Sequence, residues 1–109
     1  MKVPYCQDAL VPTDKVSNYL MNHDHSDGSS KAQFFSHVGF EHGTLSEMLI
    51  THINEHDFSE EITTLYGVKY VIMGYAESPL GIRFNLKTIW IILNNETIPK
   101  LITAYPSKK

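Results

Sequence analysis

The sequence lacks a second cysteine, so Cys6 cannot form a disulfide bond within the chain. It also lacks a long hydrophobic run, because Ile89–Leu93 is far shorter than the roughly 20 apolar residues of a membrane-spanning helix. Residues 1–12 contain no apolar stretch of the kind found in secretory signal peptides. From these absences we expect a cytoplasmic protein that does not act at a membrane.

Positive charge is not in excess either. Nine Lys and Arg residues stand against twelve Asp and Glu residues, which gives a formal net charge of −3. Domains that hold nucleic acid mainly through its phosphates are usually basic, so the composition argues against generic nucleic-acid binding. It is compatible with an enzyme that grips one phosphate with a few local cations.

Several catalytic and cofactor motifs are missing as well. The chain has no Gly-x-Ser-x-Gly segment, which argues against a serine hydrolase of the α/β type. It has no Gly-x-Gly-x-x-Gly segment and no Gly-Lys-Ser/Thr loop, so nucleotide-dependent chemistry has no support. We therefore expect no cofactor.

What is present fits one α+β domain. With 109 residues and 42% hydrophobic residues, the chain can bury a core without disulfides. The hydrophobic period changes near Asp57 from helical to alternating, which predicts helices in the first half and strands in the second. Residues 1–12 are predicted to form an extended N-terminal arm, and residues 13–109 the single domain.

Two helices are predicted on either side of a polar loop. The first begins at residue 13 or 14, and residues 22–28 are all turn-forming or polar. The second helix is capped by Ser29 or Ser30, runs through Val38 and stops at Gly39, which suits a left-handed C-cap.

A third helix is predicted from a capping box formed by Thr44 and Glu47, and it should fray near His56. His52 and His56 are spaced i, i+4 on this helix, which places two potential zinc ligands on one face. Glu55 is at the wrong offset for the His-Glu-x-x-His arrangement of metalloproteases. We therefore favour a structural role, with one histidine partly buried and one at the helix end.

The second half alternates between apolar and polar residues in four segments, joined by short turns. Short connections predict an antiparallel meander, so the fold is two or three N-terminal helices packed on one face of a four-stranded antiparallel sheet. The predicted strands are Ile62–Tyr66, Val68–Tyr75, Ile82–Leu93 and Lys100–Tyr105.

Alternation also predicts which side chains share a face. In the third strand, the side that should face the helices is apolar apart from Thr88; it consists of Ile82, Phe84, Leu86, Thr88, Trp90 and Ile92. In the last strand, Leu101, Thr103 and Tyr105 should alternate with Lys100, Ile102 and Ala104.

His25 and Lys31 form the remaining polar pattern. His25 lies in the loop and can exchange protons near neutral pH, and Lys31 lies in the first turn of the next helix. Together they could hold a phosphodiester and move its protons. On these residues alone, a surface histidine and a solvated lysine are the favoured interpretation.

Several segments resemble an uncharacterised bacterial domain family that occurs as short standalone proteins and at the C-terminal tips of polymorphic toxins. The resemblance covers roughly residues 15–106, nearly the whole chain. The segments that carry it are Tyr19–Asn22 with His25, Gly28 with Ser30–Phe35, Gly39–Phe40, Tyr66–Tyr70 with Gly74, Lys87–Ile91, and Pro99–Pro106.

The layout and the Thr-Ala-Tyr-Pro ending are similar to the ribonuclease toxins of the barnase, EndoU, colicin D and RelE-like group. This resemblance implies a metal-independent endoribonuclease, with RNA (tRNA among the candidates) as substrate and a cognate immunity protein or antitoxin as partner. The implied catalytic residues are His25 for proton transfer, Lys31 for the phosphate, Thr88 and Thr103 as hydroxyl donors, and Tyr105 as proton donor or base-stacking surface. The hypothesis requires His25, Lys31, Thr88 and Thr103 to meet in one cleft.

Two alternatives stay open at the level of function. The chain could be a non-catalytic binding module of a bacterial conflict or toxin–antitoxin system, or a metal-dependent hydrolase that uses its histidines. One alternative concerns the site: the family has Pro after the loop histidine, whereas Ser26 follows His25 here, so His23 is a rival candidate.

Overall fold

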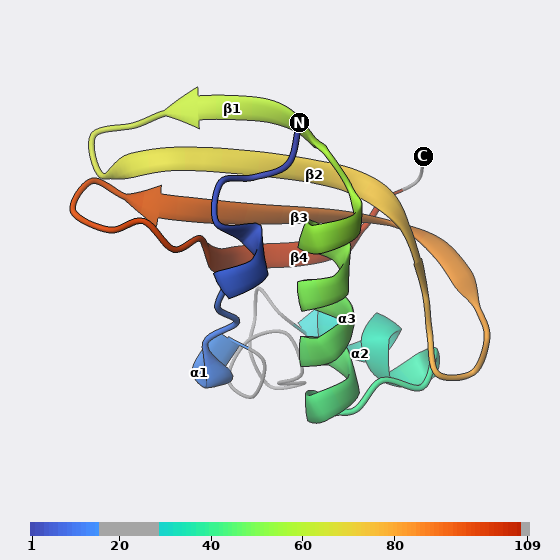
Figure 1. The fold of residues 1–109 in the computed structure, drawn as a ribbon. Helices are drawn as coiled ribbons and strands as arrows, with labels where there is room; N and C mark the ends of the chain where they lie inside the picture. The colour runs from blue at the N-terminus through green and yellow to red at the C-terminus, as the bar shows by residue number, and fades with distance from the viewer. Residues whose placement is uncertain (16–28, 108–109) are drawn as a thin grey trace.

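A computed structural model describes residues 1–15 and 29–107, with only the backbone for Lys15 and residues 29–32. Figure 1 shows the helical segments on one side of a twisted sheet, with the N-terminus near the start of its first strand. In chain order the elements are the 3-10 helix η1 (Cys6–Asp8), the helices α1 (Thr13–Lys15), α2 (Ser29–His37) and α3 (His42–Glu55), and the strands β1 (Phe58–Thr63), β2 (Gly67–Glu77), β3 (Arg83–Leu93) and β4 (Lys100–Pro106).

The four strands form one antiparallel sheet in the order β1-β2-β3-β4, which confirms the α+β class and the four-stranded sheet. The predicted boundaries of the first strand were wrong. Strand β1 begins at Phe58 and ends at Thr63, because Thr64 starts the turn. The Thr64 hydroxyl donates a hydrogen bond to the carbonyl oxygen of Gly67 over 2.7 Å, and this bond closes the turn into β2.

Helix α3 supplies most of the helical cover of the sheet. Leu45, Leu49 and Ile53 are fully buried along one side of this helix, and they share a core with Leu86 and Trp90 of strand β3. Of the first predicted helix the structure describes Thr13–Lys15, and α2 covers nine residues, close to the predicted second helix. Within the described ranges, no helix combines the length and apolar character that crossing a membrane would require.

Helix α3 begins one turn earlier than predicted. Its N-cap is Glu41, whose side chain accepts a hydrogen bond from the Thr44 amide. The Thr44 hydroxyl oxygen in turn accepts a bond from the Glu41 amide over 2.9 Å. The capping box therefore exists, but Thr44 is its third helical residue and Glu47 has no part in it.

A bulge in β4 overturns the predicted alternation of this strand. Ile89 pairs with Thr103 but Trp90 pairs with Leu101, so that one extra residue, Ile102, interrupts the ladder. Leu101 and Ala104 both face the helices and are buried, although three positions separate them. Thr103 and Tyr105 consequently face the other side of the sheet, opposite Ile89 and Lys87.

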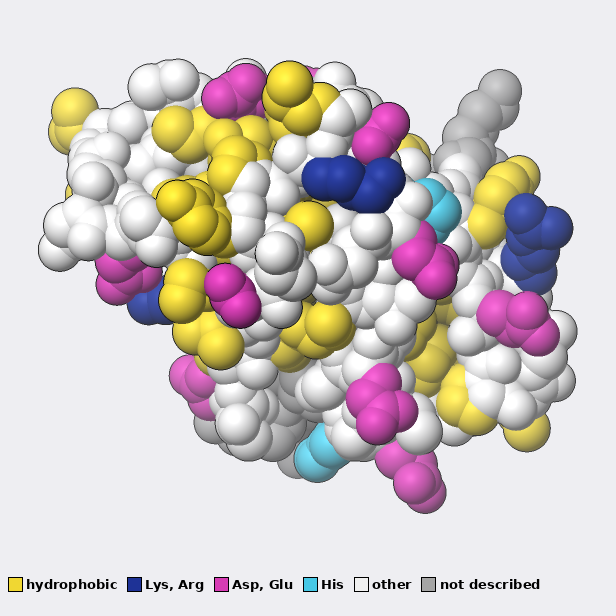
Figure 2. Space-filling model, viewed as in Figure 1, with side chains coloured by type: hydrophobic (Ala, Val, Ile, Leu, Met, Phe, Trp, Pro, Cys, Tyr) yellow, Lys and Arg dark blue, Asp and Glu magenta, His cyan; other side chains and the backbone are white. Residues whose placement is uncertain are grey.

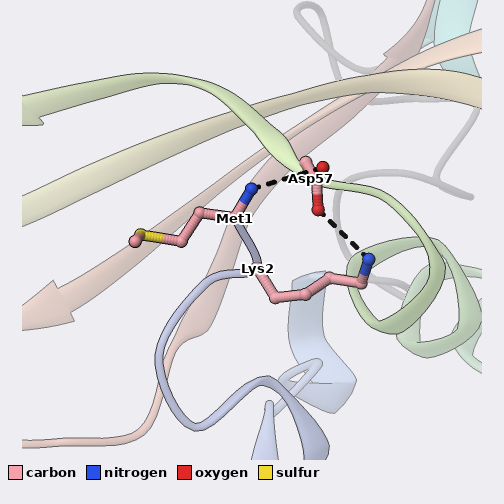
Figure 3. Close-up of polar contacts among 3 residues, drawn as sticks. All are labelled: Met1, Lys2 and Asp57. Carbon is pink, nitrogen blue, oxygen red and sulfur yellow. Dashed lines mark hydrogen bonds and ion pairs between the residues drawn. The ribbon is translucent and has the colours of Figure 1, made fainter.

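The first twelve residues pack against the body of the domain. Val3 is buried, and Leu10 pairs with Lys100 as a short parallel bridge at the edge of the sheet. The Asp57 carboxylate forms ion pairs with the N-terminal amine of Met1 over 3.2 Å and with Lys2 Nζ over 3.1 Å (Figure 3). These partners lower the pKa of the Asp57 carboxyl, Lys2 most strongly. The carboxylate is largely exposed, so its contribution to stability is small.

We expect Gly67, at the start of β2, and Gly43, in the first turn of α3, to respond differently to substitution by alanine. A Cβ at position 67 would collide with the carbonyl oxygen of Ile92, whereas a Cβ at position 43 meets nothing within 4 Å. Gly67→Ala should lower the free energy of unfolding by about 2 kcal/mol or more. Gly43→Ala should raise it by roughly 0.5 to 1 kcal/mol, since alanine is the better helix former. Urea unfolding measures both, and equal effects would contradict the strand pairing at Gly67.

Candidate functional site

The face of the sheet turned away from the helices, here called the open face, carries the cations of the strands. Among the residues that the structure describes, no helix covers this face (Figure 1). Its ionisable side chains, placed by the strand register, are Lys69, Arg83, Lys87 and Lys100 against Glu60 and Glu77. Lys100 is paired with Glu96 over 3.0 Å, and Arg83 and Glu77 stand at the hairpin end of the face, where they also line the cleft described below. The strands thus leave a small excess of positive charge on this face.

Lys87, Thr103 and Tyr105 lie together on the part of the open face formed by β3 and the edge strand β4. Lys87 and Tyr105 are register partners, and the lysine Nζ lies 5.6 Å from the centre of the tyrosine ring. Thr103 precedes Tyr105 by two positions on β4, so its side chain lies on the same face. All three are partly accessible to solvent. A cation, a phenol and an aliphatic hydroxyl thus lie on the same face of two neighbouring strands.

Thr88 is not part of this group, which corrects the predicted four-residue site. Its side chain faces the helices, is fully buried, and is hydrogen-bonded to His52 over 3.0 Å. Thr103 lies on the opposite face, so the two threonines cannot meet in one cleft. His25 lies outside the described residues, and so does the side chain of Lys31, although its backbone belongs to α2.

His52 is held between helix α3 and the sheet by hydrogen bonds at both ring nitrogens. Its Nε2 lies 3.2 Å from the carbonyl oxygen of Gly74, which can only accept, so Nε2 carries the proton. The neutral Nδ1 then accepts the bond that the Thr88 hydroxyl donates over 3.0 Å. Burial lowers the pKa of His52 to about 4, and the nearby His56 acts in the same direction. His52 is therefore a neutral structural residue at physiological pH.

His56, the C-cap residue of α3, lies against the same part of β2. The centres of the His52 and His56 rings are 4.7 Å apart, and His56 Nε2 donates to the carbonyl oxygen of Tyr75 over 3.1 Å. Only a glycine at position 74 leaves room for the ring, because a Cβ there would lie 2.6 Å from His56 Nδ1. This arrangement confirms the structural interpretation of the pair, with His52 buried and His56 at the helix end. The ring nitrogens of His52 are taken, and the residues that the structure describes contain no cluster of metal-ligating side chains.

A cleft of about 570 Å³ opens between α3 and the β2–β3 hairpin. In Figure 2 it appears as a hollow with histidine and acidic side chains near its rim. Arg83 lies over the Tyr75 ring, with 4.4 Å between the guanidinium carbon and the ring centre. The lining residues are Met48, Thr51, His52, Glu55, His56, Tyr75, Ala76, Glu77 and Arg83. Sequence analysis missed this cleft, because only the tertiary packing brings the end of α3 to the hairpin.

Comparison with known proteins gives a family and a fold. The family model described as "Domain of unknown function (DUF6883)" matches residues 2–108. The search of curated proteins finds no match. Among solved structures, a chain from a "Contact-dependent growth inhibition toxin - immunity protein complex from Klebsiella pneumoniae 342" superposes with a TM-score of 0.75 and 15% identity, covering 96% of this chain and 98% of the other. At that identity, the likeness shows a shared fold.

The pKa of His52 predicts how stability depends on pH. The folded state resists protonation down to about pH 4, while an unfolded histidine takes up its proton near pH 6.5. The stability linked to His52 is therefore complete above pH 6.5 and is lost as the pH falls from 6.5 towards 4. Between pH 7.5 and pH 5 we expect this residue to account for a loss of about 2 kcal/mol.

Urea unfolding at both pH values, with His52→Asn as the comparison, measures this loss. The exposed His37, changed to Asn, serves as the matched control and should keep the pH dependence of the wild type. An NMR titration that placed the folded-state pKa of His52 near 6.5 would contradict the expectation.

Proposed function

The chain belongs to the DUF6883 family, whose function is unknown, and we propose that this member is a toxin-type domain acting as a metal-independent endoribonuclease. In this reaction the ribose 2′-hydroxyl attacks the adjacent phosphate, and the 5′-oxygen of the next nucleotide leaves. The step needs a base for the 2′-hydroxyl, an acid for the leaving oxygen and cations or donors for the crowded phosphate.

The observation that carries the proposal is the grouping of Lys87, Thr103 and Tyr105 on a sheet face that no described helix covers. RNA in single strands is bound by a cationic surface that tracks the phosphates, together with aromatic rings on which bases stack. The open face has both cations and aromatic rings, so a chain of net negative charge would still be able to bind RNA there.

Each residue of the group has a role that fits its chemistry. Lys87 would pair with the phosphate, and Thr103 would donate a hydrogen bond to a non-bridging oxygen. The Tyr105 hydroxyl would protonate the leaving oxygen or hold the phosphate, with Lys87 beside it. His25 remains the proposed base and Lys31 a second phosphate cation, as the family resemblance implies. The earlier requirement that Thr88 and Thr103 share a cleft is not met, so the scheme is revised: Lys87 replaces Thr88, which holds His52 on the other face.

The fold likeness supports a place in a toxin system. The similar chain comes from a complex between a toxin and its immunity protein, and this chain shares its fold over nearly the full length of both. We propose on this basis that an immunity protein or antitoxin binds this domain. An RNA substrate also agrees with the cytoplasmic location expected from the sequence.

One observation favours a second candidate, a non-catalytic module that binds a protein. Leu65 and Tyr66 in the β1–β2 turn are 86% and 74% exposed, and exposed apolar side chains of this kind are common in protein interfaces. The turn is held to Asn94, whose side-chain amide donates to the Leu65 carbonyl oxygen over 2.7 Å. The cleavage assay below separates the two functions.

We expect the wild-type protein to cleave total tRNA or a single-stranded RNA in the presence of EDTA. Lys87→Ala and Tyr105→Phe should each lower the cleavage rate by about 100-fold or more, since proton transfer and phosphate stabilisation each contribute at least that much. Thr103→Val should have a smaller effect in the same direction. His25→Ala tests the proposed base in the same series.

Two matched controls accompany these variants. Lys2→Ala removes a lysine that pairs with Asp57 away from the open face, and Tyr66→Phe removes the hydroxyl of an exposed turn tyrosine. Both should cleave like the wild type. A wild-type protein that leaves every RNA intact, or variants of the open face that match the controls, would favour the binding module.

A further inference from the structure

We infer that the cleft between α3 and the β2–β3 hairpin is a binding pocket for one unpaired nucleobase that bears an exocyclic amino group. This inference rests on the proposed function, because it places next to the cleavage site the base that determines where RNA is cut.

The cleft can be reached from the open face around the edge of the sheet. Strand β1 pairs with β2 only as far as Phe58 and Ile72, so residues 73–77 of β2 form an edge in the described part of the sheet. Tyr75 lies on this edge, opposite Asn85, and Asn85 is two positions from Lys87 on the open face. Tyr75 is therefore the diagonal neighbour of Lys87 across the two strands, and such neighbours lie about 7 to 8 Å apart, a span that one nucleotide can bridge. A phosphate held at Lys87 therefore leaves an adjacent base near the cleft.

The rim of the cleft offers a stacking surface. Tyr75 is 57% exposed, and the Arg83 guanidinium lies over its ring at 4.4 Å. Unpaired bases stack on tyrosine rings and on arginine planes alike. The volume of about 570 Å³ is within the range of pockets that hold small organic groups.

The lining of the cleft selects among bases. The carboxylates of Glu55 and Glu77 have no ion pair or hydrogen bond with any residue that the structure describes. Ionised carboxylates only accept hydrogen bonds, so they favour a base edge that donates from an amino group, as cytosine, adenine and guanine do. Uracil has no amino group and offers only one ring N–H between two carbonyl oxygens, so it gives the carboxylates fewer donors and is disfavoured. The same carboxylates repel phosphate, so a base enters the cleft while the backbone stays on the cations.

Binding of nucleoside monophosphates to the full chain, followed by NMR, tests the inference directly. We expect CMP, AMP and GMP to shift the amides of Thr51, Glu55 and Ala76, and to bind at least about fivefold more tightly than UMP. Tyr75→Leu should weaken this binding by about tenfold, since stacking on an aromatic ring is lost. Glu55→Gln and Glu77→Gln should reduce the preference over UMP towards unity.

The controls share the chemistry of the variants but lie elsewhere. Glu47→Gln changes an exposed carboxylate of the same helix α3, outside the cleft, and Tyr66→Leu changes an exposed tyrosine at the other end of the sheet. Both should bind all four nucleotides as the wild type does.

The inference and the proposed function fail separately. Equal binding of UMP, shifts outside the cleft, or cleft variants that bind like the controls would overturn the nucleobase pocket, even if the protein cleaves RNA. Amino-bearing nucleotides that bind in the cleft of a protein without cleavage activity would uphold the pocket and refute the ribonuclease. If both hold, sequenced cleavage products should show an amino-bearing base beside the cut, and Glu77→Gln should relax that preference.

Discussion

The placement of helix α3 on the sheet depends on one buried polar side chain, His52. Apolar packing by Leu45, Leu49 and Ile53 holds the helix to the sheet, but such contacts tolerate sliding and rotation. The imidazole of His52 makes two hydrogen bonds, to Thr88 and Gly74, and sliding or rotation of the helix would break them. A buried donor or acceptor left without a partner costs about 1 to 3 kcal/mol. These hydrogen bonds fix the register between helix and sheet, and through His56 they also fix the end of the helix beside the hairpin.

The two faces of the sheet carry residues with different roles: core residues on the covered face and the proposed functional residues on the open face. On the covered face, Thr88 and Trp90 are fully buried and belong to the core and its polar anchor. On the open face, Lys87, Thr103 and Tyr105 are partly accessible and lie outside this core. Strand β3 serves both faces through simple alternation, so neighbouring residues of one strand have unrelated roles.

Local patterns predicted much of the fold but only part of the site. The alternation of β3 located Leu86, Thr88 and Trp90 on the covered face, since their polarity differs so clearly from that of Arg83 and Lys87. The bulge at Ile102 could not be foreseen, because no glycine or proline marks it, and it reversed the inferred relation between Thr88 and Thr103. The cleft depends on long-range packing between α3 and the hairpin. Gly74 was the one local signal, because a glycine inside a strand often marks a close approach.

The bulge also links the evolution of the open face to the length of a single strand. Deletion of one residue at the bulge would restore regular pairing between β3 and β4. Side chains on one side of the deleted residue would then change from the covered face to the open face, or the reverse. Either Ala104 would leave the core while Thr103 and Tyr105 entered it, or Leu101 would be expelled. Substitutions can therefore vary the chemistry of the open face gradually, whereas an insertion or deletion in β4 changes the core and the open face in one step.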